Sequence, residues 1–194
     1  MTSRRQPAAV EPHLNYPYYL AHCAISPLRD CVRSAMQQSI DHFWSQGMVD
    51  YASVADHREG TKASLARLFG GKATSYAFVP NASHGINHIA HGIDWKPKDT
   101  ILLFNNEFPT NIRPWLNVAK INNLDVKWLD VQPLANPDPI DLAALEGLLN
   151  EGIRVVAMSA VQFQSGVRMP LKAVEQLCQR YGALLFVDAI QTCG

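Results

Sequence analysis

Short apolar runs alternate with amphipathic segments along most of the chain after residue 71. Nearly continuous apolar runs are typical of strands buried on both faces of a parallel sheet, and they occupy residues 76–79, 100–104, 125–129, 154–158 and 183–187. Periods of three to four residues predict helices over residues 83–91, 111–121, 142–150 and 171–181. The order βαβαβαβαβ predicts an α/β fold with a mainly parallel sheet and flanking helices.

The chain before residue 71 shows a different pattern. Residues 1–20 are rich in proline and have no periodicity, which predicts an N-terminal arm. Ser26 and Pro27 favour a helix start, and Gly47 favours its end. The apolar positions between them fall on one helix face: Val32, Met36, Ile40 and Phe43. A second helix is predicted over residues 53–69, before a pair of glycines. We expect a single domain over residues 21–194 after the arm.

Composition and charge exclude several classes of protein. Hydrophobic residues make up 47% of the 194 positions and charged residues 18%, which is typical of a globular domain. Seventeen basic and seventeen acidic residues are scattered along the chain, so nucleic acid is not an expected partner. The longest apolar runs are too short to span a bilayer, and no membrane segment or signal peptide is expected. Four dispersed cysteines without a CxxC pair indicate reduced thiols and a cytoplasmic protein.

A candidate phosphate site follows the first apolar run. The residues Asn81, Ala82 and Ser83 lead directly into a predicted helix. Free backbone N–H groups, the helix dipole and the Ser83 hydroxyl would together favour a phosphate there. A simple N-cap by Asn81 or Ser83 explains the same residues. Neither a P-loop nor a GxGxxG motif occurs in the chain.

Polar residues also follow the other predicted strands, where ligands bind in open parallel sheets. These segments are residues 105–111, 162–166 and 188–191. Asp188 stands at the end of a buried strand, where a carboxylate is costly unless it meets a cation. A protonated ring nitrogen of a cofactor would be such a partner. The alternative is a structural aspartate that caps the next helix.

Three histidines, His84, His88 and His91, fall on one face of the predicted helix. Two of them could chelate one metal ion. No HExxH arrangement is present, and no carboxylate or cysteine lies nearby in sequence. We therefore expect no metal site and interpret His88 and His91 as ordinary residues of the helix surface.

Three segments together resemble the class V aminotransferase family of pyridoxal 5'-phosphate (PLP) enzymes. This family includes cysteine desulfurases, selenocysteine lyases, kynureninases and isopenicillin N epimerase-like proteins. Residues 19–28 resemble its opening segment, and residues 79–87 resemble its phosphate-binding turn. Residues 188–191 match its Asp-Ala-x-Gln signature, the most specific of the three. The resemblance implies the N-terminal part of the large domain of a fold-type-I PLP-dependent transferase.

The resemblance also implies roles for single residues. Ala82 and Ser83 would hold the cofactor phosphate, and Phe108 would stack on the pyridine ring. Asp188 would pair with the pyridine N–H, since a carboxylate keeps the ring protonated and electron-withdrawing. Ala189 would pack under the ring, and Gln191 would form a hydrogen bond with its phenolic oxygen.

Within the family, the motifs point in two directions. Desulfurases usually have a histidine where Phe108 stands, and phenylalanine cannot transfer protons. Phe108 and the turn at residues 161–166 are closer to kynureninase-like and epimerase-like members, whereas Asp-Ala-x-Gln is closer to desulfurases. The resemblance implies an amino-acid substrate and a homodimer in the complete enzyme. The reaction type stays open.

The resemblance implies a Schiff-base lysine that follows Asp188 in the family and would lie beyond Gly194. All seven lysines of this chain precede Asp188, and none lies in a matching motif. We therefore expect a chain that is incomplete at its C-terminus, lacks this catalytic residue and is inactive alone. Two alternatives remain. One is a non-catalytic phosphate- or nucleotide-binding α/β module, and the other is a truncated remnant that only pairs with a partner.

Overall fold

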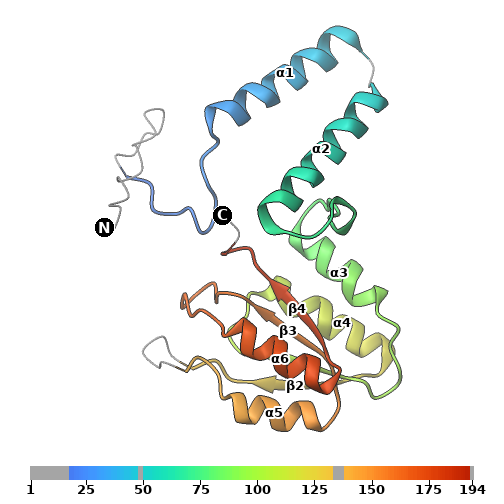
Figure 1. The fold of residues 1–194 in the computed structure, drawn as a ribbon, viewed down its shortest axis with the longest axis vertical. Helices are drawn as coiled ribbons and strands as arrows, with labels where there is room; N and C mark the ends of the chain where they lie inside the picture. Colours follow the sequence, from blue (N-terminus) through green and yellow to red (C-terminus); the bar gives the residue numbers. More distant parts are fainter. Residues whose placement is uncertain (1–17, 48–49, 133–137, 193–194) are drawn as a thin grey trace. The chain divides into compact units, whose positions relative to one another are not determined.

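A computed structural model of the chain describes residues 18–47, 50–132 and 138–192. The backbone divides into two compact units, residues 1–76 and residues 77–194. Figure 1 shows long helices in the first unit and a sheet with flanking helices in the second. Most of the predicted N-terminal arm, residues 1–17, lies outside the described residues.

The first unit contains helices α1 (Asp30–Gln46) and α2 (Tyr51–Phe69) and the short 3₁₀-helix η1 (Ala73–Ser75). The predicted start of α1 at Ser26 is wrong. The helix begins at Asp30 with Arg29 at the N-cap position, and the Ser26 hydroxyl instead lies 3.4 Å from His22 Nδ1. The predicted end is confirmed, because Gly47 adopts a left-handed φ of 64°.

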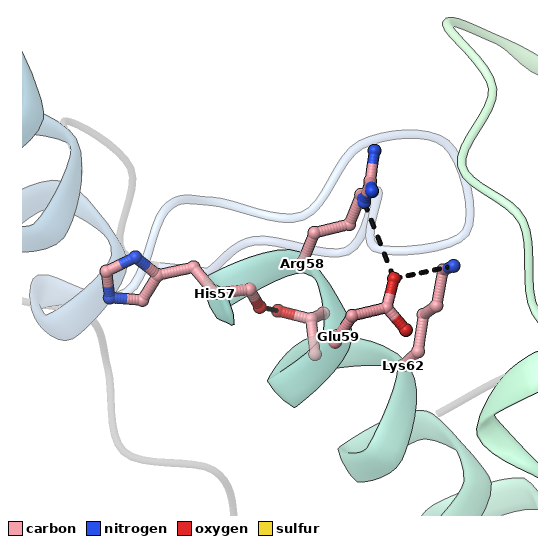
Figure 2. A network of polar contacts seen from close by, with 5 residues as sticks. His57, Arg58, Glu59 and Lys62 are labelled. Carbon is pink, nitrogen blue, oxygen red and sulfur yellow. Dashed lines mark hydrogen bonds and ion pairs between the residues drawn. The ribbon is translucent and has the colours of Figure 1, made fainter. Parts of the chain in front are cut away.

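Helix α2 begins two residues earlier than predicted because Asp50 caps it. The Asp50 carboxylate accepts hydrogen bonds from the N–H groups of Ala52 and Ser53. On the exposed side of the helix, Glu59 forms ion pairs with Arg58 and Lys62 (Figure 2). The contact between Glu59 and Lys62 joins positions three residues apart, a spacing that supports the helix locally.

The second unit is a four-stranded parallel sheet in the order β2-β1-β3-β4. The strands are β1 (Thr100–Phe104), β2 (Asp125–Leu129), β3 (Ile153–Ser159) and β4 (Leu184–Asp188). The helices are α3 (Ala82–Gly92), α4 (Arg113–Asn122), α5 (Leu142–Asn150) and α6 (Leu171–Tyr181), with the 3₁₀-helix η2 (Pro109–Asn111) before α4. The predicted fold class, a mainly parallel sheet with flanking helices, is confirmed.

Both faces of this sheet are covered, as the apolar runs predict. Alternate residues of β1 enter two separate cores. Leu102 and Phe104 pack with α5 and α6, whereas Ile101 and Leu103 pack with α3 and α4. The helix pairs accordingly lie on opposite faces of the sheet (Figure 1). Burial on both sides explains why the central strands β1 and β3 carry apolar residues at nearly every position, whereas the edge strand β2 has no buried residue.

Two predicted elements differ in the structure. Residues 76–79 run between η1 and α3 without forming a strand, and no described strand pairs with them. Phe78 and Val79 are about half exposed, since apolar and β-branched residues form a strand only beside a neighbour that completes its hydrogen bonds. The fourth helix starts at Arg113 and not at residue 111, because Pro109–Asn111 forms η2 first.

The described cysteines are free thiols. Cys23 and Cys31 are exposed, whereas Cys178 lies on the buried face of α6, in the core. Burial raises the pKa of the Cys178 thiol to about 11, so this thiol stays protonated and unreactive at neutral pH. Cys193 lies outside the described residues. Among the helices of the described part, none combines the length and apolarity that a membrane crossing requires.

Candidate active site

The candidate site lies at the carboxyl edge of the sheet, where the parallel strands deliver their following loops to one place. Ser159 and Asp188 are the last residues of β3 and β4 and are direct partners in the register of these strands. Phe108 follows β1, which pairs with β3 on its other side. The topology therefore brings together residues that lie about 80 positions apart.

A buried carboxylate organises this edge. Glu107 Oε1 accepts hydrogen bonds from the Ser159 backbone N–H and from Gln162 Nε2, each at 2.8 Å. Its Oε2 accepts from the Ser159 hydroxyl and, at 3.1 Å, from Asn111 Nδ2. All four residues are buried. Four donors on one carboxylate compensate for its removal from water.

Sequence reasoning missed this cluster. It placed Glu107, Asn111 and Gln162 among the polar residues that follow strands, without a role, and it did not single out Ser159. Glu107 and Ser159 are 52 positions apart, and no local pattern relates two such residues. The only available signal was the concentration of polar side chains directly after apolar runs.

Two amide oxygens of the cluster have no hydrogen-bond partner among the described residues. They are Asn111 Oδ1 and Gln162 Oε1, and both are fully enclosed. The two amide nitrogens are directed at Glu107, which leaves the oxygens on the opposite sides of the amide groups. The carboxylate therefore determines the orientation of both amides.

An aromatic pair lies directly beside the cluster. The rings of Phe108 and Phe163 are 5.1 Å apart at an interplanar angle of 79°, an edge-to-face contact. Each aromatic residue follows a member of the cluster in sequence, Glu107 and Gln162 respectively. Both side chains are about half exposed, so their rings face outward from the core. The position of Phe108 at this edge agrees with the predicted stacking role without testing it.

The N-terminus of α3 also reaches this edge. Asn81 caps the helix by accepting the His84 N–H at 2.9 Å, which confirms one of the two proposed caps. The Ser83 hydroxyl has no capping role and donates to Thr110 Oγ1 at 3.3 Å, in the loop after β1. The N–H groups of Ala82 and Ser83 precede the first hydrogen bond within the helix, so both can bind an anion.

A pocket of about 310 Å³ opens next to Ser83. Thr110 and Asn87 line it with polar groups, and Arg113 contributes a positive charge. Arg113 forms no ion pair with any described residue. A helix N-terminus, two hydroxyls and a guanidinium around one pocket are groups that bind phosphate.

Asp188 lies at the other end of the edge and is partly buried. Its Oδ1 accepts the Ile190 N–H at 3.1 Å, and no described cation pairs with the carboxylate. Within the described residues, Asp188 caps no helix. It lies at the start of a turn in which the Thr192 N–H donates to the Ala189 carbonyl. Ala189 and Gln191 are partly buried in this same turn.

The three histidines lie on the exposed surface of α3. The rings of His84 and His88 are 4.2 Å apart in an edge-to-face arrangement. No group of three metal-binding side chains occurs within the described part of the chain. His88 and His91 are surface residues, as predicted.

The chain is similar to known proteins over most of its length. The family model "Aminotransferase class-V" matches residues 18–194. A probable cysteine desulfurase of Vibrio cholerae is 26% identical over 89% of this chain and 44% of its own length. The uncharacterized aminotransferase YcbU of Bacillus subtilis is 25% identical over 94% of this chain and 47% of its own length. This chain spans less than half the length of these curated relatives.

Solved structures show the same fold. The apo cysteine desulfurase of Thermococcus onnurineus NA1 has a TM-score of 0.75 at 22% identity, covering 97% of this chain and 48% of that one. A variant of C-DES with glycine covalently linked to its PLP cofactor has a TM-score of 0.74 at 22% identity, covering 85% of this chain and 44% of that one. The shared fold is that of the fold-type-I PLP enzymes. The chain belongs to the class V aminotransferase family, whose cofactor is pyridoxal phosphate.

Proposed function

We propose that this chain forms the cofactor-binding part of a PLP-dependent enzyme that acts on an amino-acid substrate. The observation that carries the proposal is that Ser83, Phe108 and Asp188 all lie at the same edge of the sheet. Family membership supports PLP as the ligand. The complete enzyme would act as a homodimer, which is the state that the resemblance implies.

The residues at this edge fit the chemical groups of PLP. The phosphate would lie against the α3 N-terminus, where Ala82, Ser83 and Arg113 supply donors and positive charge. Asp188 is a partly buried carboxylate without a cationic partner among the described residues. A protonated pyridine nitrogen would supply the missing cation. Phe108 is about half exposed, so part of its ring is accessible for stacking.

Bound PLP acts as an electron sink for a carbanion formed on the substrate. Asp188 would accept the hydrogen bond of the ring N–H and hold the proton on that nitrogen. Ala189 would pack under the ring, and Gln191 would donate to the phenolic oxygen. Phe108 would fix the plane of the ring but transfer no proton, because its side chain has no ionisable group.

The lack of an ionisable group in Phe108 affects which reaction types are expected. The proposed class is either desulfurase-like and selenocysteine lyase-like, or epimerase-like and kynureninase-like. Proton transfer at the substrate would then come from groups other than the residue at position 108. A desulfurase-type reaction would release sulfur from a cysteine substrate, so sulfide formation under reducing conditions distinguishes it from the other reactions.

Replacement of Asp188 tests the proposal in the full chain. Asp188→Asn should weaken PLP binding, because the neutral amide loses a charge-assisted hydrogen bond of about 1.5 to 3 kcal/mol, roughly a tenfold to hundredfold change in Kd. PLP binding is measured by equilibrium dialysis with absorbance detection. Asp125→Asn is the control, since Asp125 is exposed at the start of β2.

Two outcomes would contradict the proposal. An unchanged Kd for Asp188→Asn would remove Asp188 from the cofactor site. Equal affinity for PLP, inorganic phosphate and a nucleotide would favour the non-catalytic phosphate- or nucleotide-binding module.

A further inference from the structure

We infer that Glu107 is a positioning residue, whose carboxylate joins the loops after β1 and β3 and thereby holds Phe108 and Phe163 together as one aromatic wall of the cofactor site. The inference rests on the proposed function for the identity of the ligand. The joining of the loops itself is a property of the free chain and is tested separately below.

The first step is the set of contacts across the two loops. Glu107 lies in the loop after β1, and two of its partners, Ser159 and Gln162, lie at the end of β3 and just beyond it. These hydrogen bonds span 52 and 55 positions of sequence. The described residues show no other side-chain hydrogen bond to Gln162. The carboxylate accepts most of the polar contacts between the two loops, and Asn111 Nδ2 adds one more by donating to the Ser159 hydroxyl at 3.3 Å.

The second step is the adjacency of the aromatic residues. Phe108 directly follows Glu107, and Phe163 directly follows Gln162. The hydrogen bond from Gln162 Nε2 to Glu107 Oε1 thus fixes the backbone beside both rings. The rings meet edge to face and are about half exposed, so their contact depends on how the two loops that carry them are held together.

The third step concerns the choice of an acid at this position. A buried carboxylate is costly, and four hydrogen-bond donors from three residues are committed to it. A shorter or apolar side chain would leave those donors unpaired inside the protein. A glutamine could keep the link, because Asn111 could turn its amide over and present its unpaired Oδ1 to the new NH₂ group.

This difference between glutamine and an apolar residue defines the test. In the full chain, Glu107→Leu should abolish the nuclear Overhauser contact between the two phenylalanine rings and weaken PLP binding about tenfold or more. Glu107→Gln should keep the ring contact and stay within about threefold of the wild-type affinity. Glu146→Gln is the control, because its carboxylate bonds Arg180 and Tyr181 away from this edge.

A milder variant covers the case in which Glu107→Leu does not fold. Gln162→Met removes one donor and keeps the size of the side chain, so only the link to the loop after β3 is broken. It should weaken the ring contact and PLP binding in the wild-type background. In a Phe163→Ala background it should have no further effect on PLP binding, since the residue through which it acts is already gone.

The outcomes separate this inference from the proposed function. Additive effects of Gln162→Met and Phe163→Ala on PLP binding would overturn it, and so would an intact ring contact in a folded Glu107→Leu protein. If the wild-type chain bound no PLP, the proposed function would fail, while the loss of the ring contact would still demonstrate the link between the loops.

Discussion

At the scale of single residues, the sheet edge carries two kinds of polar group with different tasks. Glu107 and Asn111 are buried and have their hydrogen bonds within the protein. Ser83 and Asp188 are reachable from solvent and have few partners among the described residues. The buried pair determines geometry, whereas the accessible pair is available for a ligand.

Ser83 gives the sharpest prediction at this scale. Ser83→Ala should raise the Kd for PLP about tenfold or more, because a hydroxyl hydrogen bond to a charged phosphate contributes about 1.5 to 3 kcal/mol. Isothermal titration calorimetry of the full chain measures this change. Ser39→Ala is the control, since that hydroxyl only bonds the Ala35 carbonyl within α1. An unchanged Kd for Ser83→Ala would remove Ser83 from the phosphate site.

At the scale of elements, helix stability depends on local side-chain contacts. In α2, the hydrogen bond from Lys62 Nζ to Glu59 is 3.0 Å long and is the main reason why the pKa of Glu59 lies below its ordinary value of 4.5. Burial opposes this effect, and the charges of Lys62 and Arg58 add to it. Because folding lowers this pKa, the contact stabilises the helix above about pH 4.5 and loses its effect as the pH falls through the folded value.

The prediction for α2 follows from the order of these causes. Lys62→Met should raise the pKa of Glu59 toward 4.5, and Arg58→Met should raise it by less, since Lys62 supplies the largest contribution. Carbon-13 NMR titration of the Glu59 carboxyl carbon measures both changes. High salt should reduce the difference between the variants and the wild type, because the Glu59 carboxylate is exposed to solvent ions. A larger rise in Arg58→Met than in Lys62→Met would contradict this assignment.

At the scale of the whole molecule, the chain forms two compact units whose helices differ in burial. Helices α1 and α2 contain no buried residue, although α1 carries the apolar face predicted from its spacing. The second unit instead has a core on each side of its sheet. Its stability therefore depends on side chains that fill the space between sheet and helices.

Two tryptophans test this difference. Trp115 is fully buried in α4, with its ring 5.2 Å from that of Phe186 on β4, whereas Trp44 on α1 is 87% exposed. Trp115→Ala should destabilise the second unit by about 3 to 5 kcal/mol through the cavity it leaves. Trp44→Ala should change stability by about 0.5 kcal/mol or less. Hydrogen exchange of the β1 and β3 amides measures both effects, and equal protection in the two variants would contradict this account of the core.

Local sequence alone determined most of the elements and their type. The bounds of α5 and α6 and of β1 and β2 agree with prediction, because caps, glycine stops and apolar runs act within a few residues. The same holds for the Asn81 cap and for the polar character of the sheet edge.

Tertiary structure decided what depends on distant partners. Residues 76–79 have the composition of a strand but no described neighbour to pair with, so composition alone was insufficient. The link from Glu107 to Ser159 and Gln162, and the contact between Phe108 and Phe163, exist only because parallel strands deliver their loops to one edge. Hydrogen bonds and ring contacts between such loops depend on strand order, which no local pattern along the chain contains.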